Sequence, residues 1–244
     1  MIRSGIREKA ETGLLSFFIR DPASFHSGES IGSTLGVSRV AVFQRLKALR
    51  KIGFVFDGQR KNGYTLTSTP AVPYPPLVNL LIQQLGSTLH VYPSVTTESS
   101  LATVAVKHFR DGDANCAAYK WLVKGRNVRC SEPDRVSCTV TFLYNVDFHV
   151  SEVAGLEAYT RKVLDDIIGP TVSGKPSHVL TFDFTLRVER ITCAIAHVQI
   201  LDPSAVLGRN AHRVANPFKA SNSFVVALAV SALESALKSF SLKV

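Results

Sequence analysis

Six polar side chains in the first quarter of the chain have the types and spacing needed to bind a nucleic acid. Arg39, Gln44 and Lys47 lie on the polar side of a predicted helix, where their donors can reach base edges in the major groove of DNA. Arg60 and Lys61 follow in a predicted loop, where adjacent cations suit contact with phosphate. The predicted DNA-binding residues are Ser38, Arg39, Gln44, Lys47, Arg60 and Lys61.

The element that must position the first group is an amphipathic helix between residues 38 and 53. Ser38 is the type of residue that caps a helix start, and Gly53 is typical of the position just past a helix end. One apolar stripe at i, i+4 and i+7 spacing consists of Val42, Leu46 and Leu49. The opposite side carries no acidic residue, which suits a groove lined by phosphates. Arg45 lies at the edge of the apolar stripe, and its role stays open.

The flanking segments predict a winged helix-turn-helix domain over residues 1–67. An apolar-rich helix ends before Asp21-Pro22, and a short helix over residues 27–36 precedes a turn at Gly36-Val37. After Gly53 the pattern changes to period two, which predicts strands at residues 54–56 and 64–66 with a turn starting at Asp57-Gly58. The basic loop between these strands would be the wing. Winged helices also serve as protein–protein modules, and this alternative stays open.

Net charge separates this domain from the rest of the chain. The 244 residues carry a formal net charge of +9, and residues 1–67 hold 11 Lys and Arg against 5 Asp and Glu. Residues 68–244 hold 17 against 14, so the first quarter carries most of the excess. This asymmetry favours a polyanionic partner for the first domain, double-stranded DNA above all. A generally basic surface is the alternative.

The remaining residues predict a second domain of mixed α/β or α+β type over residues 77–244. A proline-rich stretch at 68–76 is typical of a stiff, extended linker between domains. Expected strands cover residues 89–95, 114–122, 137–143, 180–188 and 191–201, and expected helices cover residues 152–168 and 221–240. Their order predicts a mixed sheet. With 45% hydrophobic residues, the chain has the composition of a globular protein.

Metal, disulfide and membrane signals are weak throughout the sequence. The four cysteines show no Cys-x-x-Cys spacing, and the seven histidines are scattered without the spacing of metal ligands. We therefore expect no metal, no cofactor and no catalytic residue. The amino terminus lacks a secretory signal, and the longest apolar run, residues 224–230, is far shorter than a membrane helix. The sequence predicts a cytoplasmic protein without a membrane partner.

A family resemblance rests on the predicted reading helix and wing. The run Ser38-Arg-Val-Ala-Val-Phe-Gln-Arg-Leu-Lys-Ala-Leu-Arg50, extended back to Phe25, and the segment Lys61-Asn-Gly-Tyr-Thr-Leu66 resemble the DNA-binding half of the bifunctional biotin protein ligases, the biotin operon repressors. The resemblance implies an α/β second half that makes biotinyl-adenylate and transfers biotin to a carrier lysine. It also implies dimerisation and operator binding promoted by the adenylated cofactor.

Four patches that carry the ligase chemistry of that family are altered in this chain. The Asp-Ser-Thr-Asn patch falls on residues 96–99 without its leading acid, and the glycine-rich adenylate loop falls on residues 123–129 with one glycine of three. The Lys-Trp-Pro-Asn-Asp strand falls on residues 181–185 without its lysine, and a further family lysine falls on Thr192. Lost cations would no longer stabilise charge at the α-phosphate. The small carboxy-terminal β-barrel of the family is also expected to be absent.

The combined prediction is a DNA-binding transcription regulator, a repressor-like pseudoenzyme that forms homodimers. Its ligase-like domain would serve dimerisation and sensing of a small-molecule effector. The residues carried over to that ligand site are Lys124, Gly125, Arg126 and Arg129. Two alternatives stay open: a divergent biotin or lipoate-type ligase that is also a repressor, and a protein-binding scaffold without a ligand.

Overall fold

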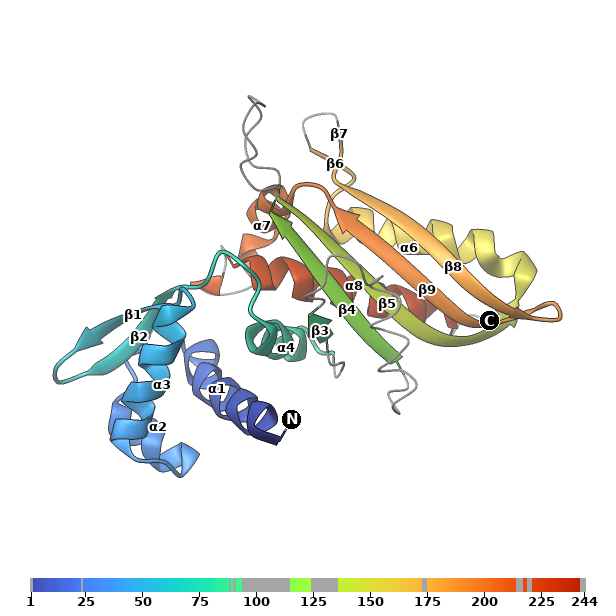
Figure 1. The fold of residues 1–244 in the computed structure, drawn as a ribbon. Helices are drawn as coiled ribbons and strands as arrows, with labels where there is room; N and C mark the ends of the chain where they lie inside the picture. The colour runs from blue at the N-terminus through green and yellow to red at the C-terminus, as the bar shows by residue number, and fades with distance from the viewer. Residues whose placement is uncertain are drawn as a thin grey trace.

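The computed structural model describes residues 2–22, 24–87, 89, 91–93, 115–123, 136–172, 175–213, 217–218 and 221–241. The first domain consists of three helices followed by a two-stranded hairpin (Figure 1). Its elements are α1 (Ile2–Arg20), α2 (Gly28–Leu35), α3 (Arg39–Lys51), β1 (Val55–Gln59) and β2 (Gly63–Ser68). This arrangement confirms the predicted winged helix-turn-helix fold.

The ends of α2 and α3 are fixed by the residues between them. The Ser27 hydroxyl accepts a hydrogen bond from the Ser30 amide at 3.0 Å and so caps the start of α2. Gly36 ends α2 in the left-handed region, with φ at 63°, and its amide donates back into the last turn of α2. The chain therefore turns sharply within a few residues, and α3 starts at a defined angle to α2.

The turn of the wing lies further along the chain than the sequence predicted. Asp57 and Gly58 are inside β1, paired with Thr65 and Tyr64, and the hairpin turns only after Gln59. Asn62 closes that turn, since its amide donates to the Gln59 carbonyl at 3.2 Å and its side chain to the Gln59 side chain at 2.7 Å. The Asp-Gly pair was a wrong turn signal because these later hydrogen bonds fix the loop instead.

The second domain contains a five-stranded mixed sheet in the order β3-β4-β5-β9-β8. The strands are β3 (Val91–Pro93), β4 (Asn115–Val123), β5 (Val136–His149), β8 (His178–Arg187) and β9 (Arg190–Ile200). β3 runs parallel to β4, and the other neighbours are antiparallel. A small hairpin of β6 (Thr171–Val172) and β7 (Lys175–Pro176) precedes β8. The predicted α+β class with a mixed sheet is confirmed.

Helices cover one face of this sheet (Figure 1). α4 (Pro75–Gln84), α6 (Val153–Ile167) and α7 (Pro203–Asn210) all contact the long helix α8 (Asn222–Ser241), which also contacts β5. Single turns of 3-10 helix lie at Val150–Glu152 and Ala211–Arg213. Alternate residues of β9 are fully buried under these helices, namely Ala194, Ala196, Val198 and Ile200. Phe182 and Phe184 pair with Ala196 and Ala194, stack with ring centroids 5.6 Å apart, and pack against this core.

The helix α8 would be long and apolar enough to cross a membrane by length and composition alone. Its mean hydropathy over Asn222–Phe240 is 1.5, so the short apolar run at 224–230 underestimated it. However, 72% of this window is buried inside the protein, as in the core helix of a soluble protein. The apolar composition of α8 is thus explained by burial against the sheet and its neighbouring helices.

The segment after β2 is held by both domains. Pro75 already begins α4, where its missing amide and fixed φ suit the first helical turn, so the extended part of the predicted linker is shorter than 68–76. The Tyr74 amide donates to the Ser223 hydroxyl at 3.0 Å, and the Tyr74 hydroxyl donates to the Glu11 carboxylate. Asn222 donates to the Ala71 carbonyl at 2.6 Å. These contacts attach the linker to α1 on one side and to α8 on the other.

Candidate nucleic-acid interface

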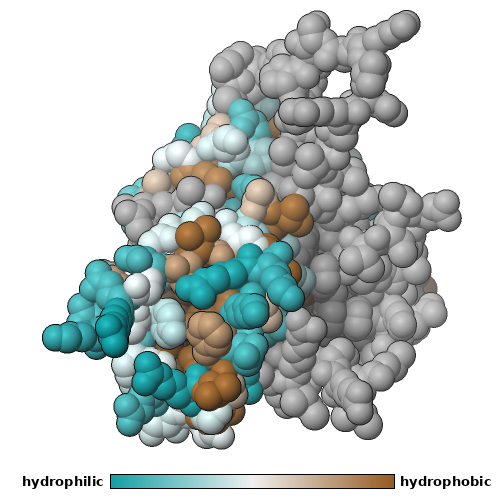
Figure 2. Space-filling model, turned by 60° about the vertical axis from the view of Figure 1, so that its left-hand side comes forward, coloured by the Kyte–Doolittle hydropathy of each residue, from teal (hydrophilic) through white to brown (hydrophobic). Residues whose placement is uncertain are grey.

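The helix α3 divides its residues sharply between the core and the surface. Val42, Leu46 and Leu49 are completely buried, while Arg39, Gln44 and Lys47 are exposed. Figure 2 shows this end of the molecule, where strongly hydrophilic side chains surround several hydrophobic ones. The predicted burial stripe is confirmed, and the three predicted base-reading side chains are free of the core. They are available to a ligand outside the domain.

Ser38 has a structural task at the start of this helix. Its hydroxyl accepts a hydrogen bond from the Ala41 amide at 3.2 Å, which satisfies one of the amides left open at a helix start. The predicted cap is confirmed. Ser38 therefore contributes to the interface by fixing where α3 begins, and so where Arg39 is placed.

The wing presents its two cations at the turn. Arg60 and Lys61 are both exposed and lie between Gln59 and Asn62, whose hydrogen bonds hold the turn closed. The loop ends at Gly63, which adopts a φ of +100°. A Cβ at Gly63 would lie only 2.2 Å from the His26 carbonyl oxygen, so this position requires glycine. The tip of the wing thus has a defined backbone that carries two exposed cations.

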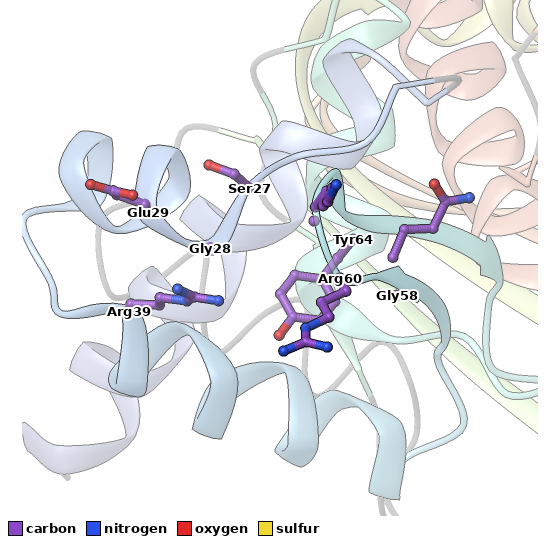
Figure 3. Close-up of a pocket in the computed structure, with 10 residues that line it drawn as sticks. Ser27, Gly28, Glu29, Arg39, Gly58, Arg60 and Tyr64 are labelled. Atoms are coloured by element: carbon purple, nitrogen blue, oxygen red, sulfur yellow. The ribbon is translucent and has the colours of Figure 1, made fainter.

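A groove of about 450 Å³ connects the wing to the starts of α2 and α3. In Figure 3, Arg39 reaches into it from α3, while Arg60 and Tyr64 point from the wing toward α3. The residues that line it are Ser27, Gly28, Glu29, Arg39, Gly58, Gln59, Arg60, Lys61, Gly63 and Tyr64. Three cations and one acid line this groove, so it suits an anionic group. The structure thus brings three predicted residues together, whereas Gln44 and Lys47 lie further along α3 and do not line the groove.

A short backbone bridge, which sequence reasoning missed, fixes the wing to the helices. The His26 amide donates to the Tyr64 carbonyl at 2.8 Å, and the Tyr64 amide donates to the His26 carbonyl at 2.9 Å. The His26 ring also packs edge-on against Phe18, with centroids 5.4 Å apart. In the sequence, His26 follows the aromatic residue Phe25 just before Ser27. Only the fold shows that His26 pairs with Tyr64 of β2.

Two further arginines of α3, Arg45 and Arg50, are partly engaged within the domain. The Arg50 guanidinium donates to the Phe56 carbonyl at 3.3 Å and lies 5.8 Å from the centre of the Phe56 ring. Arg50 therefore ties the end of α3 to β1. Arg45 is half-buried, in keeping with its predicted place at the edge of the apolar stripe. The cations best placed for an external ligand remain those at the start of α3 and in the wing.

The candidate ligand residues of the second domain lie outside the described residues. These are Lys124, Gly125, Arg126 and Arg129, together with the patch at 96–99. Within the part of the chain that the structure describes, no group of three His, Cys, Asp or Glu side chains is placed to hold a metal ion. Burial raises the pKa of the Cys193 thiol, which disfavours the reactive thiolate.

His178 belongs to a buried polar cluster at the start of the edge strand β8. Its Nδ1 lies 3.0 Å from the Ser177 hydroxyl, and its Nε2 lies 3.7 Å from the Asp165 carboxylate. Burial lowers the pKa of His178, and the attraction of Asp165 opposes this shift only in part. The Ser177 hydroxyl itself is fully buried and donates to the Gly169 carbonyl. This arrangement joins α6 to β8 and leaves the hydroxyl unavailable as a nucleophile.

Comparison with known proteins agrees with this geometry. Residues 14–65 match a protein-family model described as HTH domain. The amino-terminal domain is a helix-turn-helix domain. This match covers α2, α3 and almost the whole wing, which are the elements that carry the exposed cations. A helix-turn-helix domain indicates a DNA-binding regulator.

Similar proteins include the bifunctional ligase/repressor BirA of three bacteria. The chain is 32% identical over 109 residues to the ligase/repressor BirA of Escherichia coli (strain K12). This alignment covers 43% of this chain and 32% of that relative. The chain is 34% identical over 65 residues to those of Bacillus spizizenii (strain ATCC 23059 / NRRL B-14472 / W23) and Bacillus subtilis (strain 168), covering 27% of this chain and 20% of each. The chain thus aligns with a third or less of each relative's length. The predicted resemblance to BirA-like repressors is confirmed at this level.

Proposed function

We propose that this protein is a transcription regulator that binds double-stranded DNA through α3 and the wing. The observation that carries the proposal is the common groove into which Arg39 extends from α3 and Arg60 from the wing. An acid-free helix beside two wing cations matches a surface lined by phosphates on both sides of a groove. Double-stranded DNA offers that arrangement along its whole length.

The proposed roles follow from where each side chain lies. Gln44 and Lys47 are exposed beyond the groove on α3, where an inserted helix meets base edges. Arg60 and Lys61 lie at the tip of the wing, where they meet the sugar–phosphate backbone. Arg39 lies between the two sets and contacts either a phosphate or the first base. Ser38 positions Arg39 through the helix cap.

For the second domain we propose dimerisation and small-molecule sensing, with ligase chemistry lost. The altered patches at residues 96–99, 123–129 and 181–185 and at Thr192 support this view. In the third patch, Phe182 and Phe184 stack and pack against the core, which fills space with apolar rings. A ligand would bind near Lys124, Gly125, Arg126 and Arg129. A homodimer would place two reading helices on two half-sites, in the cytoplasm.

Fluorescence polarisation tests DNA binding directly. The full chain is titrated into labelled duplexes from its own upstream region and into scrambled duplexes of equal composition, at several salt concentrations. We expect tighter binding to an upstream duplex, with affinity falling as salt rises because counterions are released. Equal, strongly salt-dependent affinity for every duplex would contradict the regulator proposal. Light scattering of the free and DNA-bound protein measures the oligomeric state.

A divergent ligase remains the second candidate because one similarity extends beyond the first domain. The alignment with the Escherichia coli ligase/repressor covers 43% of this chain, which is more than residues 1–67 alone. Incubation of the full chain with ATP, labelled biotin and a biotin carrier domain decides between the two. We expect no transfer of label to the carrier. Transfer above the level without enzyme would contradict the loss of ligase chemistry.

A further inference from the structure

The exposed face of α3 carries two large apolar side chains that the proposed DNA contacts leave unused. Val40 is 67% exposed and Phe43 is 44% exposed, whereas the core residues of the same helix are completely buried. Two neighbouring exposed apolar side chains form a small patch, and covering that patch with a ligand is favourable because it removes apolar surface from water. The question is which ligand covers these two side chains.

Helical spacing places the two apolar residues among the predicted reading residues. Val40 and Phe43 are three residues apart, Gln44 follows Val40 by four, and Lys47 follows Phe43 by four. Residues at these spacings are neighbours on a helix surface. A single stripe therefore presents two apolar groups, then an amide and then an ammonium group. Figure 2 shows the same mixture of hydrophobic and hydrophilic side chains at this end of the molecule.

The surrounding charge favours DNA over a protein as the partner of this stripe. Every charged residue of α3 is a cation, and Arg60 and Lys61 of the wing add two more in the same domain. A DNA groove supplies negative charge on both sides of the inserted helix. It also offers one apolar group on the base edges of its major groove, the 5-methyl group of thymine.

We propose that Val40 and Phe43 contact thymine 5-methyl groups, so that the operator carries thymine where each side chain meets it. This inference rests on the proposed function and names the bases that the helix selects. Gln44, beside the apolar pair, has the two-headed amide that pairs with adenine. The stripe as a whole therefore favours A·T pairs at the centre of each half-site. The phosphate contacts would be the same for any sequence.

The test starts from a duplex selected by the full chain from a random library. Each thymine of the selected site is then replaced by uracil, which keeps every hydrogen-bonding group and removes only the methyl. We expect uracil to weaken binding about fourfold at the contacted positions, in line with the burial of one methyl group. At the other thymines of the site, uracil leaves the affinity unchanged.

Variants then assign each methyl group to a side chain. Val40→Ala and Phe43→Ala are expected to weaken binding, and each removes the effect of uracil at one position only. Val72→Ala is the matched control, since Val72 is 55% exposed in the segment between the domains. It should bind like the parent chain. Both target residues are exposed, so the variants should fold, and thermal unfolding verifies that they do.

The outcomes distinguish this inference from the proposed function. Sequence-specific binding that is insensitive to every thymine-to-uracil change would overturn the thymine contact and leave the regulator proposal standing. Full affinity of both alanine variants for the selected duplex would likewise overturn the thymine contact and leave the regulator proposal standing. Failure to select any sequence would refute the proposed function and the inference together.

Discussion

The two domains differ in where their exposed apolar side chains lie. In the first domain, Ile52 and Val55 are exposed at the ends of elements, but Val40 and Phe43 are exposed within the helix α3, opposite its core stripe and among its cations. In the second domain, Val179 lies on the edge strand β8 and Val188 in the turn after it, while the helix-facing side of the sheet is covered by α8. The exposed pair within α3 is the basis of the proposed thymine contact, whereas Val179 and Val188 lie at the edge and end of a strand. Exposure is informative only together with its surroundings.

Charge strengthens this contrast. Residues 1–67 have a net charge of +6 and residues 68–244 a net charge of +3, although the second segment is much longer. In the first domain, cations occur along the whole length of α3, and Arg39 at its start lines one groove with Arg60 and Lys61 of the wing. The comparison therefore predicts that changes in the first domain affect DNA binding, and that equivalent changes in the second do not.

The largest effect is expected from Leu46→Ala. Leu46 lies on the buried side of α3 and is completely buried, so the truncation should lower the free energy of unfolding by roughly 2–5 kcal/mol. Lys47→Ala is the matched change on the exposed side and should alter stability by less than about 0.5 kcal/mol. Urea unfolding followed by circular dichroism measures both. If Lys47→Ala destabilised the chain as much as Leu46→Ala, the division of α3 into core and surface would be wrong.

The next effect concerns the wing cations. Arg60→Ala and Lys61→Ala should weaken binding to all duplexes alike, and each should reduce the slope of log affinity against log salt by about 1. Lys162→Ala removes the same charge from an exposed position of α6 and should leave that slope unchanged. Polarisation at four salt concentrations measures the slopes. Equal slopes for Lys61→Ala and Lys162→Ala would mean that general charge, and not the wing, carries the binding.

A smaller effect is expected from Ser38→Ala. Loss of the hydroxyl that accepts from the Ala41 amide should cost about 1 kcal/mol of unfolding free energy. Ser33→Ala, at an exposed position inside α2, should change little. The cap also fixes the start of α3, so Ser38→Ala should weaken DNA binding while Arg39 is intact. Unchanged stability would show that the first turn of α3 is held by other contacts.

The smallest effect is a pH dependence of the unfolding free energy that arises from His178 in the second domain. Burial lowers the pKa of His178 below its ordinary value of about 6.5, so the unfolded chain binds this proton more readily than the folded chain. The contribution of neutral His178 to the unfolding free energy is fully present above about pH 6.5. It is lost as the pH falls toward the pKa of His178 in the folded chain. His178→Gln stays neutral and should lose less stability between pH 7 and pH 5, as urea titrations measure. Parallel curves for both chains would refute the assignment.

Local signals in the first domain were sufficient for most of its fold. Ser38 caps α3 where the sequence predicts a cap, and Val42, Leu46 and Leu49 form the predicted buried stripe. The turn of the wing was misplaced because Asp57-Gly58 is a common turn pair, while the actual turn depends on Gln59 and Asn62 bonding across the loop. Such a side-chain pair leaves no distinctive pattern in a single sequence.

In the second domain the sequence predicted the long strands and the helices α6 and α8, but not α4, α7, the β6–β7 hairpin or the pairing of the strands. Its strands were predicted from β-branched and aromatic residues and, at residues 180–188, from clear alternation. These signals did not specify that β9 lies between β5 and β8. The linker was predicted from its prolines alone. Its attachment through Tyr74 to Glu11 and Ser223 joins residues far apart in the chain, which no local pattern indicates. The four ligand residues at 124–129 remain a sequence-based prediction.

The sequence by itself determined the helix-turn-helix, the cationic side of α3 and the basic tip of the wing, because capping, periodicity and charge act over a few neighbouring residues. Only the tertiary structure decided that Arg39 and Arg60 face the same groove, since this depends on the His26–Tyr64 bridge between the wing and the helices. Helical periodicity already places Val40 and Phe43 opposite the buried stripe of α3, and the structure confirms that both are exposed. Only the tertiary structure decided that Phe182 and Phe184 pack against the core. Helical periodicity predicts the buried side of α3, whereas the partner of a strand face depends on how distant segments of the chain pack together.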